Sequence, residues 1–228
     1  MGEGSKATSN QQPATSNQAC ITSGRPNLRV MPQLALFDTG ARVLLDDSSG
    51  LIRYTPACID ARQAQDWFEA LRADIPWRAQ RRQMYEREVD VPRLTAHYPL
   101  DAETPPLLLA AAAGVSEACG AAFNSVGLNY YRDGQDSVAP HNDHLYEIEA
   151  HQPIALLSLG AIREMLIRAK QAPRRLLKID LEAGSLLLMS YAVQLNYDHG
   201  IPKTRDPVGP RISLAFRVRP AKGRSYGG

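Results

Sequence analysis

The segment around which the rest of the chain is organised spans residues 128–143 and has the sequence LNYYRDGQDSVAPHND. Its first four residues are apolar or aromatic and predict a short strand, and residues 132–134, Arg-Asp-Gly, have the composition of a tight turn. A second extended piece then leads to His141 and Asp143. Because residues two apart in a strand point to the same side, we expect this imidazole and this carboxylate to project into one space. The segment therefore predicts half of a metal site.

Composition indicates a globular protein. The chain has 228 residues, 44% hydrophobic and 22% charged, enough for one domain with a sizeable core. The net charge of +2 is too small to indicate nucleic-acid binding by itself. Cys20, Cys58 and Cys119 are widely spaced and form no C-x-x-C pair. We therefore expect neither a disulfide framework nor a zinc knuckle, and we expect a cytoplasmic location.

Residues 1–27 are rich in Ser, Thr, Asn and Gln, and we expect a disordered tail there rather than a secretory signal. Residues 28–228 are expected to form a single domain. The longest apolar run, residues 107–115, is too short to cross a bilayer, which needs about 20 residues. We expect a soluble monomer with no membrane partner.

Two helices are expected before a region of short strands. Asp60 is a candidate N-cap for a helix that reaches about Ala73, since apolar side chains recur along one face of it. Thr104, followed by two prolines, is a candidate cap for a second helix that reaches about Phe123. Short strands are expected at residues 34–37, 41–45, 51–54, 128–131, 153–159, 163–168, 176–181, 185–190 and 211–218. This pattern predicts a jelly roll or barrel with helical support.

Residues 78–93 are charged, with five arginines among acidic side chains. One interpretation is a solvated loop, because charge runs usually face water. The other is a rim that contacts phosphates, because the arginines are interleaved with Tyr85 and followed by His97 and Tyr98, which offer stacking surfaces.

His199 is a candidate third ligand for the predicted metal site. It lies in the polar, turn-prone segment NYDHGIP, residues 196–202, just after an apolar strand. Alone, a histidine in such a segment is more often a structural loop residue than a metal ligand. With His141 and Asp143 it completes a set of two histidines and one carboxylate, which binds non-haem Fe(II) on one face and leaves the opposite positions open.

Residues 210–217, PRISLAFR, predict a strand with an unusual face. Arg211, Ser213, Ala215 and Arg217 would share one side, with the intervening apolar residues on the other. Arginines on an interior face are costly unless anions pair with them, and a dicarboxylate is a natural partner for guanidinium groups. The alternative is an exposed edge strand with both arginines in water.

The order Asn129-x-Tyr131, His141-x-Asp143, His199 and Arg211-x-Ser213-x-Ala215-x-Arg217 resembles the AlkB family of Fe(II)- and 2-oxoglutarate-dependent dioxygenases. Residues 153–160 and 184–189 resemble its core strands, and the likeness covers about residues 77–220. The resemblance implies an α+β, mainly β fold, a double-stranded β-helix or jelly roll at about residues 124–220. Supporting N-terminal helices and a nucleotide-recognition lid at about residues 77–103 are also implied.

The resemblance further implies a role for each site residue. His141, Asp143 and His199 would hold the iron and form the catalytic centre. Arg211 with Tyr131 would hold the distal carboxylate of 2-oxoglutarate, and Arg217 with Asn129 would serve its end nearer the metal. Ser213 would complete this co-substrate site. Substrate contacts are expected from Arg93, Tyr98, His144 and Glu147, and phosphate contacts from residues 170–175, Lys203 and Arg205.

Two departures from the family pattern concern specificity. Family members commonly place an acid one or two positions after the iron aspartate, whereas this chain has His144 and Leu145 there, and Glu147 is the nearest acid. In the arginine strand, the usual Asn and Thr are replaced by Ser213 and Ala215.

The activity that the resemblance implies is oxidative demethylation of N-alkylated nucleobases in DNA or RNA, hence DNA alkylation repair. It would consume O2 and convert 2-oxoglutarate to succinate. A base inside a duplex cannot reach such a metal, so base flipping or a single-stranded substrate is expected. The alternatives are a 2-oxoglutarate-dependent hydroxylase or demethylase of a protein or small molecule, and a non-catalytic jelly-roll binding module.

Overall fold

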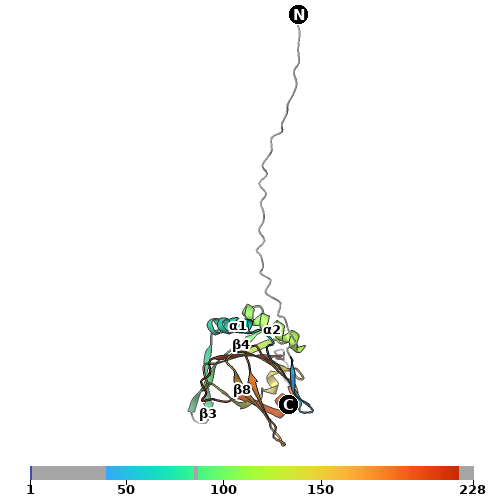
Figure 1. Cartoon of the computed structure of the whole chain (residues 1–228), viewed down its shortest axis with the longest axis vertical. Coiled ribbons are helices and arrows are strands. Elements are labelled where there is room, and N and C mark those ends of the chain that lie inside the picture. Colours follow the sequence, from blue (N-terminus) through green and yellow to red (C-terminus); the bar gives the residue numbers. More distant parts are fainter. Residues whose placement is uncertain (2–39, 85–86, 221–228) are drawn as a thin grey trace. The chain divides into compact units, whose positions relative to one another are not determined.

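Two antiparallel β-sheets form the framework of the domain (Figure 1). The computed structural model describes Met1 and residues 40–84 and 87–220, without the side chains of residues 80–90. The expected tail at residues 1–27, the expected strand at residues 34–37, and Cys20 lie outside the described residues.

The larger sheet has eight strands in the spatial order β1-β2-β10-β7-β12-β5-β4-β3. Their bounds, in that order, are Arg42–Asp47, Gly50–Thr55, Leu186–Met189, Ile154–Gly160, Arg211–Arg217, Ser125–Tyr131, Arg87–Pro99 and Arg78–Met84. The smaller sheet has four strands in the order β6-β11-β8-β9, with bounds Val138–His141, Tyr197–Ile201, Arg163–Ala169 and Leu176–Leu181.

Three α-helices and one short 3-10 turn, η1 (Leu145–Glu147), accompany the sheets: α1 (Ala61–Asp74), α2 (Pro106–Cys119) and α3 (Tyr191–Asn196). Helix α1 begins where the sequence predicts, because the Asp60 carboxylate accepts a 2.8 Å hydrogen bond from the backbone N–H of Gln63. Figure 1 shows α1 and α2 lying over the same side of the sheets. Among the described residues, no helix combines the length and apolar character that a membrane span requires.

The larger sheet separates two hydrophobic cores. On one side, Trp67 and Phe68 of α1 and Leu108 of α2 pack against apolar residues of β5, β7, β10 and β12. On the other side, residues of both sheets meet, among them Leu156 of β7 and Ile167 of β8. Because strand residues alternate between these sides, each central strand fills both cores. The expected mainly β jelly roll with helical support is therefore confirmed.

Three local expectations are wrong. Residues 78–84 and 87–93 of the charged segment do not form a loop but lie in the antiparallel strands β3 and β4, and β4 also pairs with β5. Helix α2 ends at Cys119, before Phe123, because Gly120 adopts a left-handed conformation with φ +65°. Thr104 does not cap α2, since its hydroxyl donates instead to the carbonyl oxygen of Pro99.

Of the cysteines that the structure describes, Cys58 and Cys119 are free thiols.

Candidate metal and co-substrate site

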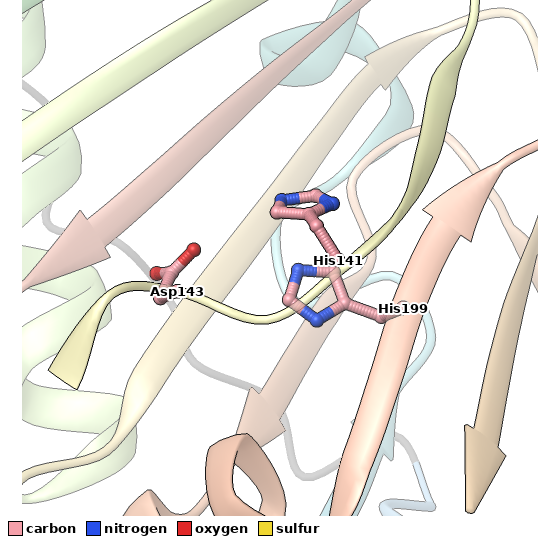
Figure 2. Close-up of side chains that lie close together, drawn as sticks. All are labelled: His141, Asp143 and His199. Carbon is pink, nitrogen blue, oxygen red and sulfur yellow. The ribbon is translucent and has the colours of Figure 1, made fainter. Parts of the chain in front are cut away.

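His141, Asp143 and His199 lie together although the last is far along the chain. Strands β6 and β11 pair with His141 directly opposite His199, and their ring centroids are 4.5 Å apart. One ligand atom from each of the three side chains lies within 4.8 Å of the others. Figure 2 shows the two imidazoles side by side, with the Asp143 carboxylate beyond them on the segment that carries His141.

The local structure differs from the expectation for two of the three residues. Strand β6 ends at His141, so Asp143 lies just past the strand rather than within it. His199 lies in the middle of β11, which pairs with both β6 and β8, and not in a loop. Two pairing partners therefore fix the position of His199.

Asp143 is held by two neighbours. Its backbone N–H donates to Oε1 of Gln194 at 3.0 Å, and its carboxylate forms an ion pair with Nε of Arg217. Burial alone would raise the pKa of Asp143, but the charge of Arg217 and its hydrogen bond outweigh burial and leave this pKa below its usual value. The carboxylate is therefore ionised at neutral pH, as a metal ligand must be.

Both histidines can offer a ring nitrogen to a metal. Burial lowers the pKa of His199 to about 3, with repulsion from His141 acting in the same direction, so His199 is uncharged at neutral pH. His199 Nδ1 is buried and makes no hydrogen bond to any part of the chain that the structure describes. In His141, Nδ1 lies 3.0 Å from the carbonyl oxygen of Ala139, so a proton on Nδ1 leaves Nε2 free. The donor set fits a divalent iron with open coordination positions.

The arginine face of β12 points into the protein, which excludes the alternative of an exposed edge strand. Strand β12 lies between β7 and β5, and Ile212, Leu214 and Phe216 are buried on the helix side. The opposite face lines a cavity of about 200 Å³ that also borders His141 and His199. The residues of β12 on that cavity are Arg211, Ser213, Ala215 and Arg217, as the alternation predicts.

Arg211 is the principal anion-binding candidate in this cavity. Its side chain is only 1% exposed, lies 5.2 Å from the centre of the Tyr131 ring, and donates one 2.9 Å hydrogen bond to Ser158. Its Nε and Nη1 have no hydrogen-bond partner among the described residues. Burial lowers the pKa of Arg211 and raises that of the Tyr131 hydroxyl. A buried guanidinium with two unused donors fits a carboxylate ligand, which supports the predicted 2-oxoglutarate site.

The second predicted pair is arranged differently from the expectation. Asn129 also lines the cavity, but its side-chain oxygen accepts a 2.7 Å hydrogen bond from Nε of Arg93. Arg217 is engaged with Asp143 instead. Asn129 therefore lies beside Arg93 in the structure, and Arg217 lies at the metal end of the cavity.

A second cavity, of about 510 Å³, adjoins the first at Arg93, His141 and Arg217. His144 and Glu147, for which substrate contacts are predicted, line this cavity. Tyr98 does not, because it lies on the face of β4 that packs against the helix-side core. The structure thus brings Arg93, His144 and Glu147 to the metal site but leaves Tyr98 away from it.

The segments expected to contact phosphates are partly engaged within the protein. Lys170 donates to Oδ1 of Asn142 at 3.0 Å and to the carbonyl oxygen of Gln194 at 2.9 Å, and Arg175 pairs with Asp47 at 3.1 Å. Lys203 and Arg205 are exposed.

Three residues of the site were not identified from the sequence. Gln194 is fully buried and binds Asp143, Lys170 ties the metal-bearing segment to α3, and Arg163 is buried behind Tyr131. For Arg163, the only signal in the sequence was its place as the first residue of β8, a strand in which buried and more exposed residues otherwise alternate. Gln194 gave no signal, and Lys170 was predicted only within the phosphate-contacting residues 170–175, because both roles depend on contacts between distant segments.

Comparison with known proteins identifies the family. Residues 98–217, more than half of the chain, match the family model of the 2OG-Fe(II) oxygenase superfamily. Alpha-ketoglutarate-dependent dioxygenase alkB homolog 3 of Bos taurus is 33% identical over 186 residues, which cover 72% of this chain and 64% of that protein. DNA oxidative demethylase ALKBH2 of Bos taurus is 36% identical over 110 residues, 45% of this chain and 40% of that protein.

The chain therefore spans less than two thirds of the length of these relatives. A solved structure described as "The structure of OsALKBH1" superposes with a TM-score of 0.51 at 14% identity, over 73% of this chain and 97% of that one, which shows a shared fold. The chain belongs to the 2OG-Fe(II) oxygenase superfamily, and its similarity to alkB homolog 3 and ALKBH2 agrees with the AlkB resemblance of its ordered motifs.

Proposed function

We propose that this protein is an Fe(II)- and 2-oxoglutarate-dependent dioxygenase that removes N-methyl groups from nucleobases in DNA or RNA and acts in alkylation repair. The observation that carries the proposal is the arrangement of two cavities around one cluster of ligands. His141, Asp143 and His199 adjoin the buried guanidinium of Arg211 on one side and the larger second cavity on the other. The name of one relative, DNA oxidative demethylase, supports the choice of substrate.

The chain's own residues bind and orient the reactants. When bound, iron and 2-oxoglutarate would supply the oxidation of an N-methyl carbon by O2, after which the hydroxymethyl group leaves the nitrogen as formaldehyde. Arg211 would hold a carboxylate at the far end of the first cavity, and Ser213 lies on the same face of β12. Arg217 keeps the Asp143 carboxylate ionised and in place at the metal end.

The second cavity would hold the base. His144 lies on its lining and stacks on Tyr146, with ring centroids 5.3 Å apart and ring planes 19° apart. Tyr146 is 70% exposed, so this aromatic pair offers a stacking surface at the rim for a base taken out of its helix. Glu147, the nearest acid after Asp143, pairs with Arg219 at 3.3 Å on the same side.

The test is to incubate the full chain with Fe(II), 2-oxoglutarate and oligonucleotides that contain 1-methyladenine or 3-methylcytosine, as DNA and as RNA, single- and double-stranded. Mass spectrometry would follow loss of the methyl group, and succinate would be measured in parallel. Asp143→Ala should abolish both products, whereas the matched control Asp74→Ala, at an exposed aspartate at the end of α1, should leave both unchanged. If the protein binds 2-oxoglutarate but leaves every oligonucleotide methylated, the nucleobase substrate is refuted.

A further inference from the structure

Arg163, the first residue of β8, is a buried arginine whose hydrogen bonds all go to backbone carbonyl oxygens. It is 3% exposed. Its guanidinium donates to Asp133 and Asp136 at 3.0 Å each and to Pro202 at 2.6 Å. These carbonyls belong to the turn between β5 and β6 and to the residue that follows β11. One side chain thus links the turn before β6 to the residue just after β11, outside the paired strands that hold the metal histidines.

The same guanidinium contacts the co-substrate cavity indirectly. Its central carbon lies 5.7 Å from the centre of the Tyr131 ring, and that of Arg211 lies 5.2 Å from the same ring. Tyr131 and Arg211 line the cavity, whereas Arg163 is not part of the lining. Arg163 therefore contacts Tyr131, which lines the cavity, but does not reach the cavity itself.

Burying the Arg163 guanidinium beside that of Arg211 costs free energy, whereas burying a hydrophobic side chain at the same position would not. No carboxylate side chain forms an ion pair with Arg163 among the described residues, and Asp136 is engaged by Arg132 at 2.8 Å. Two positive charges next to one aromatic ring would instead be stabilised by an anion that enters the cavity.

We propose that Arg163 is a positioning residue for 2-oxoglutarate: it fixes the Tyr131 ring, and thereby the Arg211 guanidinium, at the end of the cavity away from the metal. This inference rests on the proposed function only in taking 2-oxoglutarate as the co-substrate. Arg217, at the opposite end of β12, pairs with Asp143 and marks the metal end. Arg211 is therefore placed for the carboxylate farther from the metal.

The test measures binding rather than turnover, in the full chain loaded with Mn(II) and without nucleic acid. Calorimetry would give the dissociation constants of 2-oxoglutarate and of 2-oxobutyrate, which lacks the distal carboxylate. In Arg163→Gln, the preference for 2-oxoglutarate over 2-oxobutyrate should fall by roughly tenfold, the change that corresponds to about 1.4 kcal/mol. Arg163→Lys keeps the charge but not the fork of donors, and should show an intermediate loss.

Two measurements separate this role from a purely structural one. The affinity for Mn(II) should stay at the wild-type value, because β6 and β8 still hold His199 in place. Arg168→Gln, an exposed arginine on the same strand, should leave every constant unchanged. A lower melting temperature with an unchanged preference for 2-oxoglutarate would overturn the proposal, in Arg163→Lys if Arg163→Gln does not fold. If the wild-type chain itself shows no preference for 2-oxoglutarate, the proposed function fails as well.

Discussion

Replacing Arg211 by methionine should make the protein more stable in the absence of 2-oxoglutarate and insensitive to its presence. Arg211 is 1% exposed, and burial lowers its pKa, so folding costs free energy to keep this guanidinium charged. Methionine is shorter than arginine but also unbranched and flexible, and it has no charge and no donors that need partners. The substitution therefore removes the free-energy cost of burying the guanidinium, and with it the group that would bind the carboxylate.

The magnitude follows from the contacts of Arg211. Two donors, Nε and Nη1, have no partner among the described residues, and each buried unpaired donor costs about 1–3 kcal/mol. The losses are the hydrogen bond to Ser158 and the contact with the Tyr131 ring, about 1 kcal/mol each. The balance is a gain of about 2 kcal/mol in the free energy of unfolding. Wild-type protein, in contrast, should gain about 2.7 kcal/mol when 2-oxoglutarate is present at 100 times its dissociation constant.

Urea unfolding of both proteins, loaded with Mn(II) and with or without 2-oxoglutarate, would measure these differences. The order of stability should reverse. The variant should be the more stable protein without 2-oxoglutarate, and the wild type should be the more stable protein with it. Arg168→Met, which alters an exposed arginine of β8, should behave as the wild type does in both conditions. A variant that is less stable without 2-oxoglutarate, or that 2-oxoglutarate stabilises as strongly as the wild type, would refute the assignment of Arg211.

Three further substitutions test other parts of the structure. Asp143→Asn should remove most of the Mn(II) affinity measured by calorimetry, since it deletes a charged ligand; retained affinity would place the metal elsewhere. Gln194→Ala removes the acceptor of the Asp143 N–H and should weaken Mn(II) binding by about 10–100-fold, measured by competition with a chelator. Unchanged Mn(II) affinity would show that this hydrogen bond does not position Asp143 for the metal. Asp60→Ala deletes the N-cap of α1 and should lower the unfolding free energy by about 1 kcal/mol while metal affinity stays unchanged, and a change in metal affinity would contradict this separation.

Local sequence patterns predicted the elements whose side chains alternate or recur regularly. Helix α1 begins after Asp60 and buries Ala64, Trp67, Phe68 and Leu71, since both the cap and the apolar face are written in neighbouring residues. The interior arginine face of β12 follows equally from strand alternation. Such patterns identify which residues share a side, because that property depends only on the period of the element.

Pairing between distant segments is not encoded in this way. The charge-rich residues 78–93 have the composition of a solvated loop, yet β4 pairs with both β3 and β5 as part of the larger sheet. Strand formation depends on pairing with neighbouring strands as well as on composition, so a charged composition does not exclude a strand. The loop interpretation was wrong because it considered only the composition of the side chains and not the pairing with neighbouring strands.

His199 shows why the structure of the functional site differs most from what the local sequence predicts. Residues 197–201, Tyr-Asp-His-Gly-Ile, have a polar composition typical of a turn, but they form β11 because β6 and β8 pair with it on either side. The polar side chain of His199 is tolerated at 6% exposure since it faces the cavity with His141 instead of the apolar core. Sites that bind metals violate local rules for this reason: the ligand repays the cost of burying polar groups. His199, a polar residue inside β11, is such a case, and the role proposed for Arg163 at the start of β8 would make it another.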